Sequence, residues 1–513
     1  MDRKPRSRPS TSTLVASAAV LVLALVYGCS RAVRDNPSTP SSRGGEAGPA
    51  AQATASPSSL SQQQFTPVGR LSLSPDHGPW GTRVTATSAG LEPGAGYDLV
   101  WTSVDGAWKL SADRTAYEGR QYRPVQRTLA SGRAGDDGVF TATFDVPNDF
   151  GFQHDVFVVW QGRPQNKAGF DVDLQVSVSP ASGPPGTPIT IEARGIGWQQ
   201  LENSWLVSYD NKFTGWLSAV TTHGLARAVI PATGGPGVHV VTVLHGDFTF
   251  PYLNMQQSPE PDRPQFHLNF TVTGGPAVLP PPVAAQLMPT STASAPSGDG
   301  PALWLDPPDG IVGSAATVHA RGLPPNADVD LAWATVVGNR VSGSGWEEQA
   351  KAIGQARTDA SGALAWQLTV PDDLGGLHTV SARAGGRTLA GGTFTIRPSA
   401  ALLSVTSGPP GTEVLVQLHG VGWTETANIY NIVYDNAYAG YACGFNSGGN
   451  VQVFLRMSGA PGWHFIDLYP GIYKGKETRP INFRIPQLTY AADHPGERLP
   501  AFHFAFYITA PGQ

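Results

Sequence analysis

The sequence predicts an all-β protein made of tandem β-sandwiches. Its 513 residues include 60 Gly and 45 Pro but only 14% charged residues, which favours short strands joined by turns over amphipathic helices. Apolar and polar residues alternate in many short runs, as they do in half-buried strands. The two halves of the chain also repeat each other, so the pattern describes several similar domains.

The duplication is visible in motifs that recur at a fixed distance. Ser-Gly-Pro-Pro-Gly-Thr at 182–187 returns at 407–412, 225 positions later. Phe-His at 266–267 returns at 502–503, 236 positions later, so the second copy holds an insertion of 11 residues before this point. The offset of 225 is also kept by Gly-x-Gly-Trp (195–198 and 420–423), Tyr-Asp-Asn (209–211 and 434–436) and a histidine (His239 and His464).

The segments before these motifs are repeated too. Asp-Leu-Val-Trp at 98–101 matches Asp-Leu-Ala-Trp at 330–333, and each repeated unit spans about 100 residues, the length of a β-sandwich. One strand face is apolar in both copies: Phe140, Ala142, Phe144 and Val146 in the first, and Leu364, Trp366, Leu368 and Val370 in the second. We therefore predict a signal peptide over 1–29, a tether over 30–66, domain A1 over 67–174, domain B1 over 175–273, a Pro/Ser/Ala-rich linker over 274–301, domain A2 over 302–399 and domain B2 over 400–513.

The start of each B unit resembles IPT/TIG-type immunoglobulin-like domains. The resemblance is carried by the turn at 182–187, the alternating Ile189, Ile191 and Ala193, and Gly-Ile-Gly-Trp at 195–198. The A units have a weaker version of the turn and resemble bacterial immunoglobulin-like repeats. The resemblance implies four immunoglobulin-like sandwiches in the order A-B, A-B. These turn and core features specify a fold and no activity.

The N-terminus is typical of an export signal. A cationic start is followed by an uncharged apolar stretch over 14–28, which is shorter than the ~20 residues that a membrane-spanning helix needs. Val26, Gly28 and Cys29 resemble a lipobox, although Tyr27 is bulkier than usual at its position. The resemblance implies that Cys29 carries a lipid, with acyl chains such as palmitate, and holds the protein on the extracytoplasmic side of the cell membrane. The alternatives are an ordinary secretory signal with an incidental cysteine and an uncleaved anchor.

The segment 30–66 has almost no apolar residues to bury, so we expect a disordered tether. A flexible coil of this length would span roughly 30–40 Å. Cys443 is the only other cysteine, so no intrachain disulfide framework is expected. A net charge of -5 and a pI near 6.2 give no basic surface for nucleic acid.

The Tyr-Asp-Asn motifs are the candidate ligand-binding residues. Asp and Asn at the end of an apolar strand favour a tight hairpin turn, which is the structural interpretation. The functional interpretation is a rim for sugars, in which aromatic faces pack on CH groups and Asp and Asn bind hydroxyls. The residues concerned are Tyr209, Asp210, Asn211 and Trp216 in B1, and Tyr434, Asp435, Asn436 and Tyr441 in B2.

Four histidines and two long segments have less specific signals. Each histidine shares a strand face with apolar residues, so we expect a core-edge side chain that bonds a loop carbonyl. The segments 246–264 and 471–500 exceed a normal hairpin loop. They are either recognition loops or an extra strand or flap that covers a sandwich edge. The histidines are His154, His239, His378 and His464.

Enzymatic signatures are missing from the sequence. No Gly-x-Ser-x-Gly elbow or His-Glu-x-x-His pair occurs, and neither a metal site nor a cofactor is expected. The first interpretation is therefore a noncatalytic, membrane-tethered spacer and interaction module of the adhesion type. The alternative is carbohydrate or cell-wall binding by the B domains, with a polysaccharide or a surface protein as partner. An enzyme with a site built from loops is the less favoured third interpretation.

Overall fold

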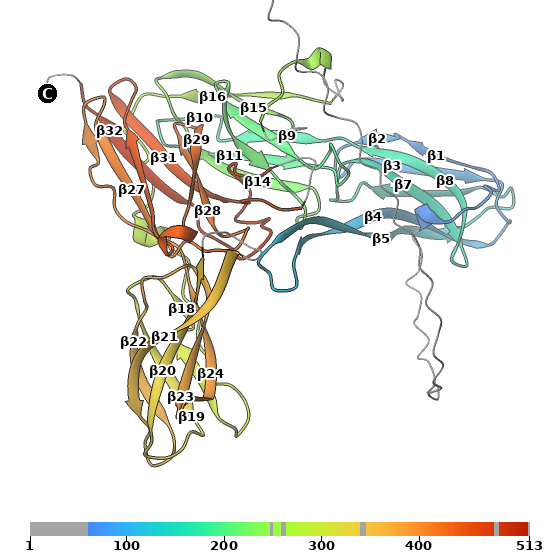
Figure 1. The fold of residues 1–513 in the computed structure, drawn as a ribbon. Helices are drawn as coiled ribbons and strands as arrows, with labels where there is room; N and C mark the ends of the chain where they lie inside the picture. Colours follow the sequence, from blue (N-terminus) through green and yellow to red (C-terminus); the bar gives the residue numbers. More distant parts are fainter. Residues whose placement is uncertain (1–59, 247–249, 258–262, 339–344, 477–481, 511–513) are drawn as a thin grey trace, which may run out of the picture. The chain divides into compact units, whose positions relative to one another are not determined.

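The computed structural model describes residues 60–246, 250–257, 263–338, 345–476 and 482–510. Cys29 and the expected signal peptide lie outside the described residues. Ser58–Gln513 forms one compact unit (Figure 1). All the described hydrophobic cores lie inside Ser58–Gln513, so this unit holds the packing that it needs to fold alone.

Four β-sandwiches follow one another, and each packs a three-stranded sheet on a five-stranded sheet. The predicted fold class, all-β with tandem immunoglobulin-like sandwiches in a duplicated A-B, A-B order, is confirmed. In A1 the three-stranded sheet is β1 (Arg70–Ser74), β3 (Arg83–Ala89) and β6 (Phe140–Asp145), and the five-stranded sheet is β2 (His77–Gly78), β8 (Arg163–Val172), β7 (Phe152–Trp160), β4 (Gly96–Leu110) and β5 (Tyr117–Arg133).

The other three domains repeat this strand order. B1 consists of β14 (Leu225–Pro231), β11 (Pro188–Arg194) and β9 (Gln175–Ser179), with β10 (Ser182–Gly183), β16 (Phe266–Val272), β15 (Gly237–His245), β12 (Trp205–Tyr209) and β13 (Lys212–Leu217). A2 consists of β17 (Ala302–Asp306), β19 (Ala315–Arg321) and β22 (Leu364–Thr369), with β18 (Asp309–Gly310), β24 (Arg387–Ile396), β23 (Gly376–Ala384), β20 (Asp328–Gly338) and β21 (Trp346–Arg357). B2 consists of β25 (Ser399–Ala400), β27 (Glu413–His419) and β30 (Val451–Arg456), with β26 (Ser407–Gly408), β32 (Phe502–Ile508), β31 (Gly462–Gly471), β28 (Ile429–Tyr434) and β29 (Ala437–Cys443).

A short second strand ties the two sheets of every domain together. The strands β2, β10, β18 and β26 each pair in parallel with the last strand of their domain, whereas the other ladders within the described strands are antiparallel. The turn residues found in the sequence follow directly after these strands, because the chain must bend there toward the other sheet. Period-two alternation then sends every second residue into the core between the sheets.

The core of each A domain is organised around one tryptophan. Trp101 in A1 is fully buried and stacks on His154, with ring centroids 4.3 Å apart. Its Nε1–H donates to Asp149 at 3.0 Å. In A2, Trp333 stacks on His378 and donates to Asp373 in the same way. The buried polar cluster is therefore duplicated with the fold.

The A-domain histidines lie at the core edge, as the alternation predicts. His154 Nε2 lies 2.8 Å from the carbonyl oxygen of Phe150, and His378 Nε2 lies 2.8 Å from that of Leu374. Both rings are buried, and each Nδ1 faces a second carbonyl oxygen. These side chains fasten the loop before each strand to the sheet.

The expected tether is shorter than the sequence suggested. Leu60, at the start of the short 3-10 helix η1 (Leu60–Gln62), is buried against β4 and β7 of A1. Phe65 packs on Phe157, with ring centroids 6.0 Å apart. These two apolar side chains pack against Val100, Phe157 and Val159 of A1, so residues 60–66 belong to the folded unit.

Residues of the linker over 274–301 make specific contacts with both B domains. The Val278 N–H donates to the Pro185 carbonyl at 2.8 Å. Gln286, at the end of the 3-10 helix η3 (Val283–Gln286), forms two hydrogen bonds with the backbone of His503. Val283 and Leu287 pack against the core of B2.

The joint between an A domain and its B domain is also duplicated. The Gly151 N–H of A1 donates to Ile196 of B1, and the Gly375 N–H of A2 donates to Val421 of B2, at 3.1 and 3.0 Å. A methyl group on Gly151 would lie 1.7 Å from the Gly195 carbonyl oxygen. Only glycine permits this approach of two backbones. Because the same contact occurs in both A-B pairs, the repeated structural unit is the A-B pair together with its joint.

We predict that Gly151→Ala opens the A1–B1 joint. The added methyl group meets backbone, so the joint should lose about 1–3 kcal/mol of stability. Hydrogen-exchange mass spectrometry of the Ser58–Gln513 unit should show faster exchange in peptides that cover 149–152 and 194–198. Gly96→Ala in β4 is the control, because its methyl group would meet nothing closer than 4.0 Å. Equal exchange in the two variants would contradict the proposed joint.

Candidate functional site

The Tyr-Asp-Asn motifs form the hairpin turns that join β12 to β13 and β28 to β29. Asp210 and Asn211 have φ of 49° and 61°, and Asp435 and Asn436 have φ of 48° and 60°. Two successive residues with positive φ are typical of a type I′ turn, which matches the twist of the flanking strands. Asp and Asn tolerate this conformation better than other non-glycine residues.

The aspartates of these turns hold the B-domain histidines. Asp210 Oδ2 lies 2.6 Å from His239 Nδ1, and Asp435 Oδ2 lies 2.5 Å from His464 Nδ1. Burial lowers the pKa of His464, but the hydrogen bond and charge of Asp435 raise it more, so the net pKa is raised. The Asp–His pairs thus connect each hairpin turn to the adjacent strand.

The aromatic residues of the expected rim lie in different places. Tyr209 is buried and donates its hydroxyl to the Thr233 carbonyl, and the Tyr434 hydroxyl donates to Ser458. Trp216 is buried between domains, whereas Tyr441 is 42% exposed. The structure brings Tyr, Asp and His together within each copy but does not assemble the eight residues into one exposed rim.

Asn436 differs from its counterpart Asn211. Asn211 is exposed, but Asn436 is fully buried because it contacts the other B domain. Its side-chain Nδ2 donates to the Pro231 carbonyl of B1 at 2.8 Å, and its backbone carbonyl oxygen accepts from Thr214 Oγ1 of B1 at 2.7 Å. The turn of the second copy is therefore part of the B1–B2 contact.

Three domains contribute to one shared hydrophobic cluster, which we call the interdomain core. Figure 1 shows β4 and β5 continuing as a two-stranded ribbon past the other strands of A1, and the end of this ribbon supplies Tyr117. Ile472 and Ile485 come from B2. The buried members are Tyr117 of A1, Leu206, Trp216 and Leu244 of B1, and Ile472 and Ile485 of B2.

The described part of the long segment 471–500 covers an edge strand of B1. The backbone N–H of Trp216 in β13 donates to the carbonyl oxygen of Pro486 at 2.9 Å. The backbone N–H of Leu488 donates to the carbonyl oxygen of Trp216, also at 2.9 Å. Trp216 and Gln487 form a parallel bridge, so B2 adds a short extension to the B1 sheet. The sequence left open a recognition loop or a flap over a sandwich edge. The contacts are those of a flap, but the edge that it covers belongs to the neighbouring domain.

Asp493 is the polar centre of this contact. Its side chain is buried and accepts hydrogen bonds from A1 and B1 at once. Trp108 Nε1 of A1 donates to it at 2.8 Å. The backbone N–H groups of Val220 and Thr221 in B1 donate at 2.8 and 3.0 Å, and Thr221 Oγ1 donates at 2.8 Å. One carboxylate from B2 thus satisfies four donors from two other domains.

A second buried carboxylate fixes the tip of the A1 ribbon to B2. The Tyr117 N–H donates to Glu425 Oε2 at 2.8 Å, and the Glu425 N–H donates to the Thr115 carbonyl at 2.9 Å. Near them, Lys476 forms an ion pair with Glu118 at 2.6 Å. The ribbon of A1 is therefore bonded to B2 through its backbone as well as through side chains.

The sequence motifs do not identify Asp493, Glu425 and Trp108 as contact residues. The 11-residue insertion in the second copy was the available signal, since it lies in the segment that holds Asp493. Within the described ranges, no three His, Cys, Asp or Glu side chains are grouped as metal ligands would be. The described residues also hold no helix of the length and hydropathy that would cross a membrane.

The fold and these joints define the class: a tandem immunoglobulin-like β-sandwich protein with interlocked domains. No protein-family model and no curated protein matches the chain. A solved tetra-tandem repeat from the extending region of a large adhesion protein is 12% identical, covering 86% of this chain and 100% of that chain at a TM-score of 0.18. A putative membrane anchored protein from Corynebacterium diphtheriae is 12% identical over 64% of this chain and 89% of that chain, with a TM-score of 0.17. An ICAM-5 ectodomain fragment is 13% identical over 82% and 99%, with a TM-score of 0.16. Likenesses this weak add no argument about function.

We predict that Asp493→Ala uncouples the three domains. The change leaves buried donors without an acceptor, so the contact should lose at least about 3 kcal/mol. Calorimetry of the Ser58–Gln513 unit should show a lower first melting temperature and a split of the transition shared by A1, B1 and B2. Asp136→Ala removes an exposed aspartate of A1 and should leave the melting profile unchanged. Identical profiles for the two variants would contradict the role of Asp493.

Proposed function

We propose that the chain is an exported bacterial lipoprotein that acts as a noncatalytic spacer and interaction module of the adhesion type. A lipid on Cys29 would hold it on the extracytoplasmic side of the cell membrane. Its B units would be IPT/TIG-type domains. The observation that carries the proposal is the interdomain core, because it turns three sandwiches into one stiff body. A stiff body can hold a binding surface at a fixed distance from its membrane anchor.

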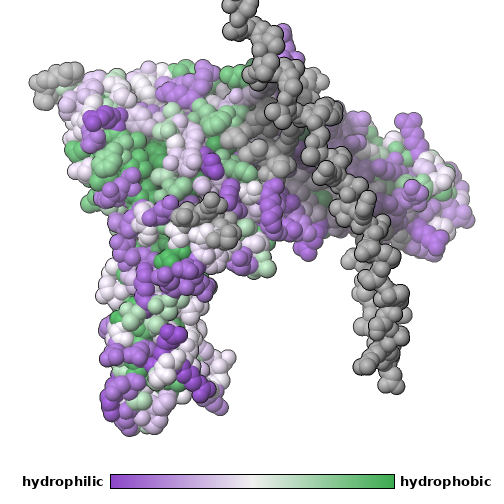
Figure 2. Space-filling model, viewed as in Figure 1, coloured by the Kyte–Doolittle hydropathy of each residue, from purple (hydrophilic) through white to green (hydrophobic). Residues whose placement is uncertain are grey.

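The outer face of the three-stranded sheet of B2 is the surface that best fits a protein partner. Phe454 in β30 is 60% exposed and Leu402 is 78% exposed. Leu415 is the cross-strand partner of Phe454 on the same outer face. Figure 2 shows hydrophobic residues gathered on the face of B2, whereas hydrophobic and hydrophilic residues are interspersed over A2. Exposed apolar groups that lie together are typical of interaction sites.

The matching face of B1 supports this choice. Val229 occupies in B1 the position that Phe454 occupies in B2, and its carbonyl accepts a 3.4 Å hydrogen bond from Tyr469 of B2. The same edge strand is thus already used for a domain contact in the first copy. In the second copy the equivalent position carries the larger Phe454, which is 60% exposed, against 46% for Val229.

We predict that the lipid is attached through Cys29. Metabolic labelling of producing cells with a palmitate analogue should label the wild-type chain and the Cys443→Ser variant. Cys29→Ser should lose the label and the mature chain should leave the membrane fraction. An unmodified mature N-terminus in mass spectrometry of the wild-type protein would contradict the anchor.

We predict that the purified Ser58–Gln513 unit captures a surface protein from envelope extracts. Phe454→Asp should reduce capture at least about tenfold, because it places a charge in the apolar contact. Gln452→Asp, on the same strand and face, is the matched control for added charge. Turnover of a polysaccharide, peptide or ester panel by the wild-type unit would contradict a noncatalytic role. Glycan-array binding that is lost in Tyr441→Ala would instead favour the carbohydrate alternative.

A further inference from the structure

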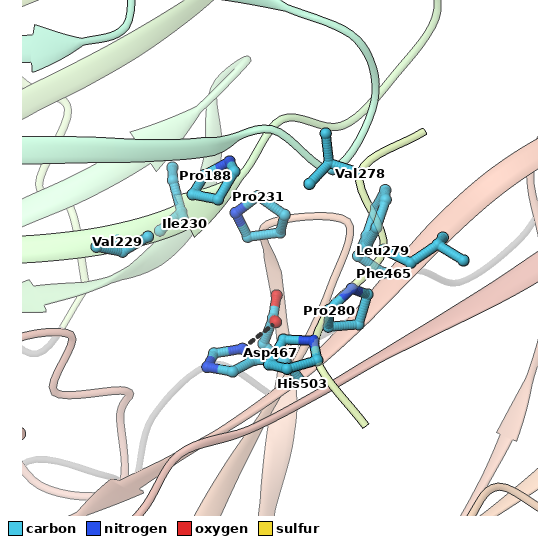
Figure 3. A pocket seen from close by; sticks show the side chains of 12 residues that line it. Pro188, Val229, Ile230, Pro231, Val278, Leu279, Pro280, Phe465, Asp467 and His503 are labelled. Atoms are coloured by element: carbon cyan, nitrogen blue, oxygen red, sulfur yellow. Dashed lines mark hydrogen bonds and ion pairs between the residues drawn. The ribbon is translucent and has the colours of Figure 1, made fainter. Parts of the chain in front are cut away.

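A cavity of about 230 Å³ lies between B1, the linker and B2 (Figure 3). Its walls are mostly apolar. Pro188, Ile230 and Pro231 come from B1, and Phe465 comes from β31 of B2. The linker closes one side with the segment 278–281. The cavity therefore exists only because the linker and the two B domains pack together.

Two polar side chains stand out in this apolar wall. Asp467 and His503 are cross-strand partners on β31 and β32, and Asp467 Oδ1 lies 2.7 Å from His503 Nδ1. Burial lowers the pKa of His503, but the hydrogen bond and charge of Asp467 raise it more, so the net pKa is raised. His503 is thus the donor that occupies one carboxylate oxygen.

The second carboxylate oxygen of Asp467 has no hydrogen-bond donor. The Asp467 side chain is only 2% exposed, and Oδ2 is a buried atom without a partner. Figure 3 shows this oxygen pointing away from His503, toward the space beside Pro231. A buried carboxylate oxygen without a donor is unfavourable, so a bound donor would be strongly favoured there.

The first copy of the domain shows that the aspartate is not required by the fold. The position of Asp467 is taken by Thr242 in B1, and Thr242 Oγ1 lies 3.1 Å from His267 Nδ1. Threonine is therefore enough to position this histidine on the sheet. The aspartate is found only in the copy whose face lines the cavity.

The volume limits what the cavity can hold. An apolar cavity of ~150 Å³ accommodates benzene, so this cavity has room for roughly ten non-hydrogen atoms. The walls favour a hydrocarbon body, and Asp467 Oδ2 requires one donor. A neutral hydroxyl fits this demand better than an ammonium group, because an ammonium group would lose its hydration among the apolar walls.

We propose that this cavity is a binding site for a small apolar alcohol or phenol, whose hydroxyl donates to Asp467 Oδ2. The ligand would bridge B1, the linker and B2. Its hydrocarbon body would lie against Ile230, Pro231 and Phe465. Ligand binding would thereby stabilise the contact between the two B domains.

Titration calorimetry of the Ser58–Gln513 unit with 4-isopropylphenol tests the site. Saturable binding of one equivalent is expected. Asp467→Thr installs the residue of the first copy and should weaken binding at least about tenfold, since it removes a hydrogen bond to a charged acceptor. Binding of 4-isopropyltoluene, which has a methyl group in place of the hydroxyl, should be nearly the same in both proteins.

A cavity-filling variant keeps the test independent of the Asp–His pair. Val278 lines the cavity and is 41% exposed, so Val278→Trp should fold and block both probes. Val238→Trp, at an exposed position of B1 outside the cavity, should block neither. The proposal is overturned if the wild-type unit binds neither probe. It is also overturned if Asp467→Thr, with an unchanged circular dichroism spectrum, binds 4-isopropylphenol as tightly as the wild type.

Discussion

The arrangement of A1, B1 and B2 depends on one buried carboxylate. Asp493 brings a negative charge into a contact where the donors are an indole N–H of A1 and backbone N–H groups of B1. A buried charge is tolerated only when hydrogen bonds replace its hydration, and here four donors do so. The same donors would be unsatisfied without it, so the carboxylate and the three domains stabilise one another.

The same contact also covers an edge strand of the B1 sheet. The strands β13 and β29 are edges of the five-stranded sheets of B1 and B2, and unpaired edges favour association with other chains. Residues 486–488 pair with β13, and the hairpin of B2 packs beside it. The exposed backbone groups of B1 are thus used inside the molecule. The open apolar face of B2 remains for the proposed partner.

Much of the fold could be predicted because it depends on local chemistry. Period-two alternation identified the core faces, and positive φ at Asp and Asn explains the hairpin turns. The histidines follow from the same alternation. The predicted tether was too long by several residues, because the side chains of β4 and β7 on which Leu60 and Phe65 pack cannot be identified from the segment itself. The burial of Trp216 and Asn436 could not be predicted either, since each side chain is covered by a neighbouring domain. The two residues occupy ordinary surface positions within their own sandwiches.

The most direct test of the interlocked arrangement is a distance measurement between A1 and B2. In the Ser58–Gln513 unit Cys443 is the only cysteine and is exposed, so a spin label there reports on B2. A second label at Asp136→Cys reports on A1, and a pair at Cys443 and Phe454→Cys gives the width expected within one domain. We expect the distance distribution between A1 and B2, measured by pulsed electron paramagnetic resonance, to be as narrow as the one within B2. A broad distribution, typical of domains on flexible linkers, would contradict the interlocked arrangement.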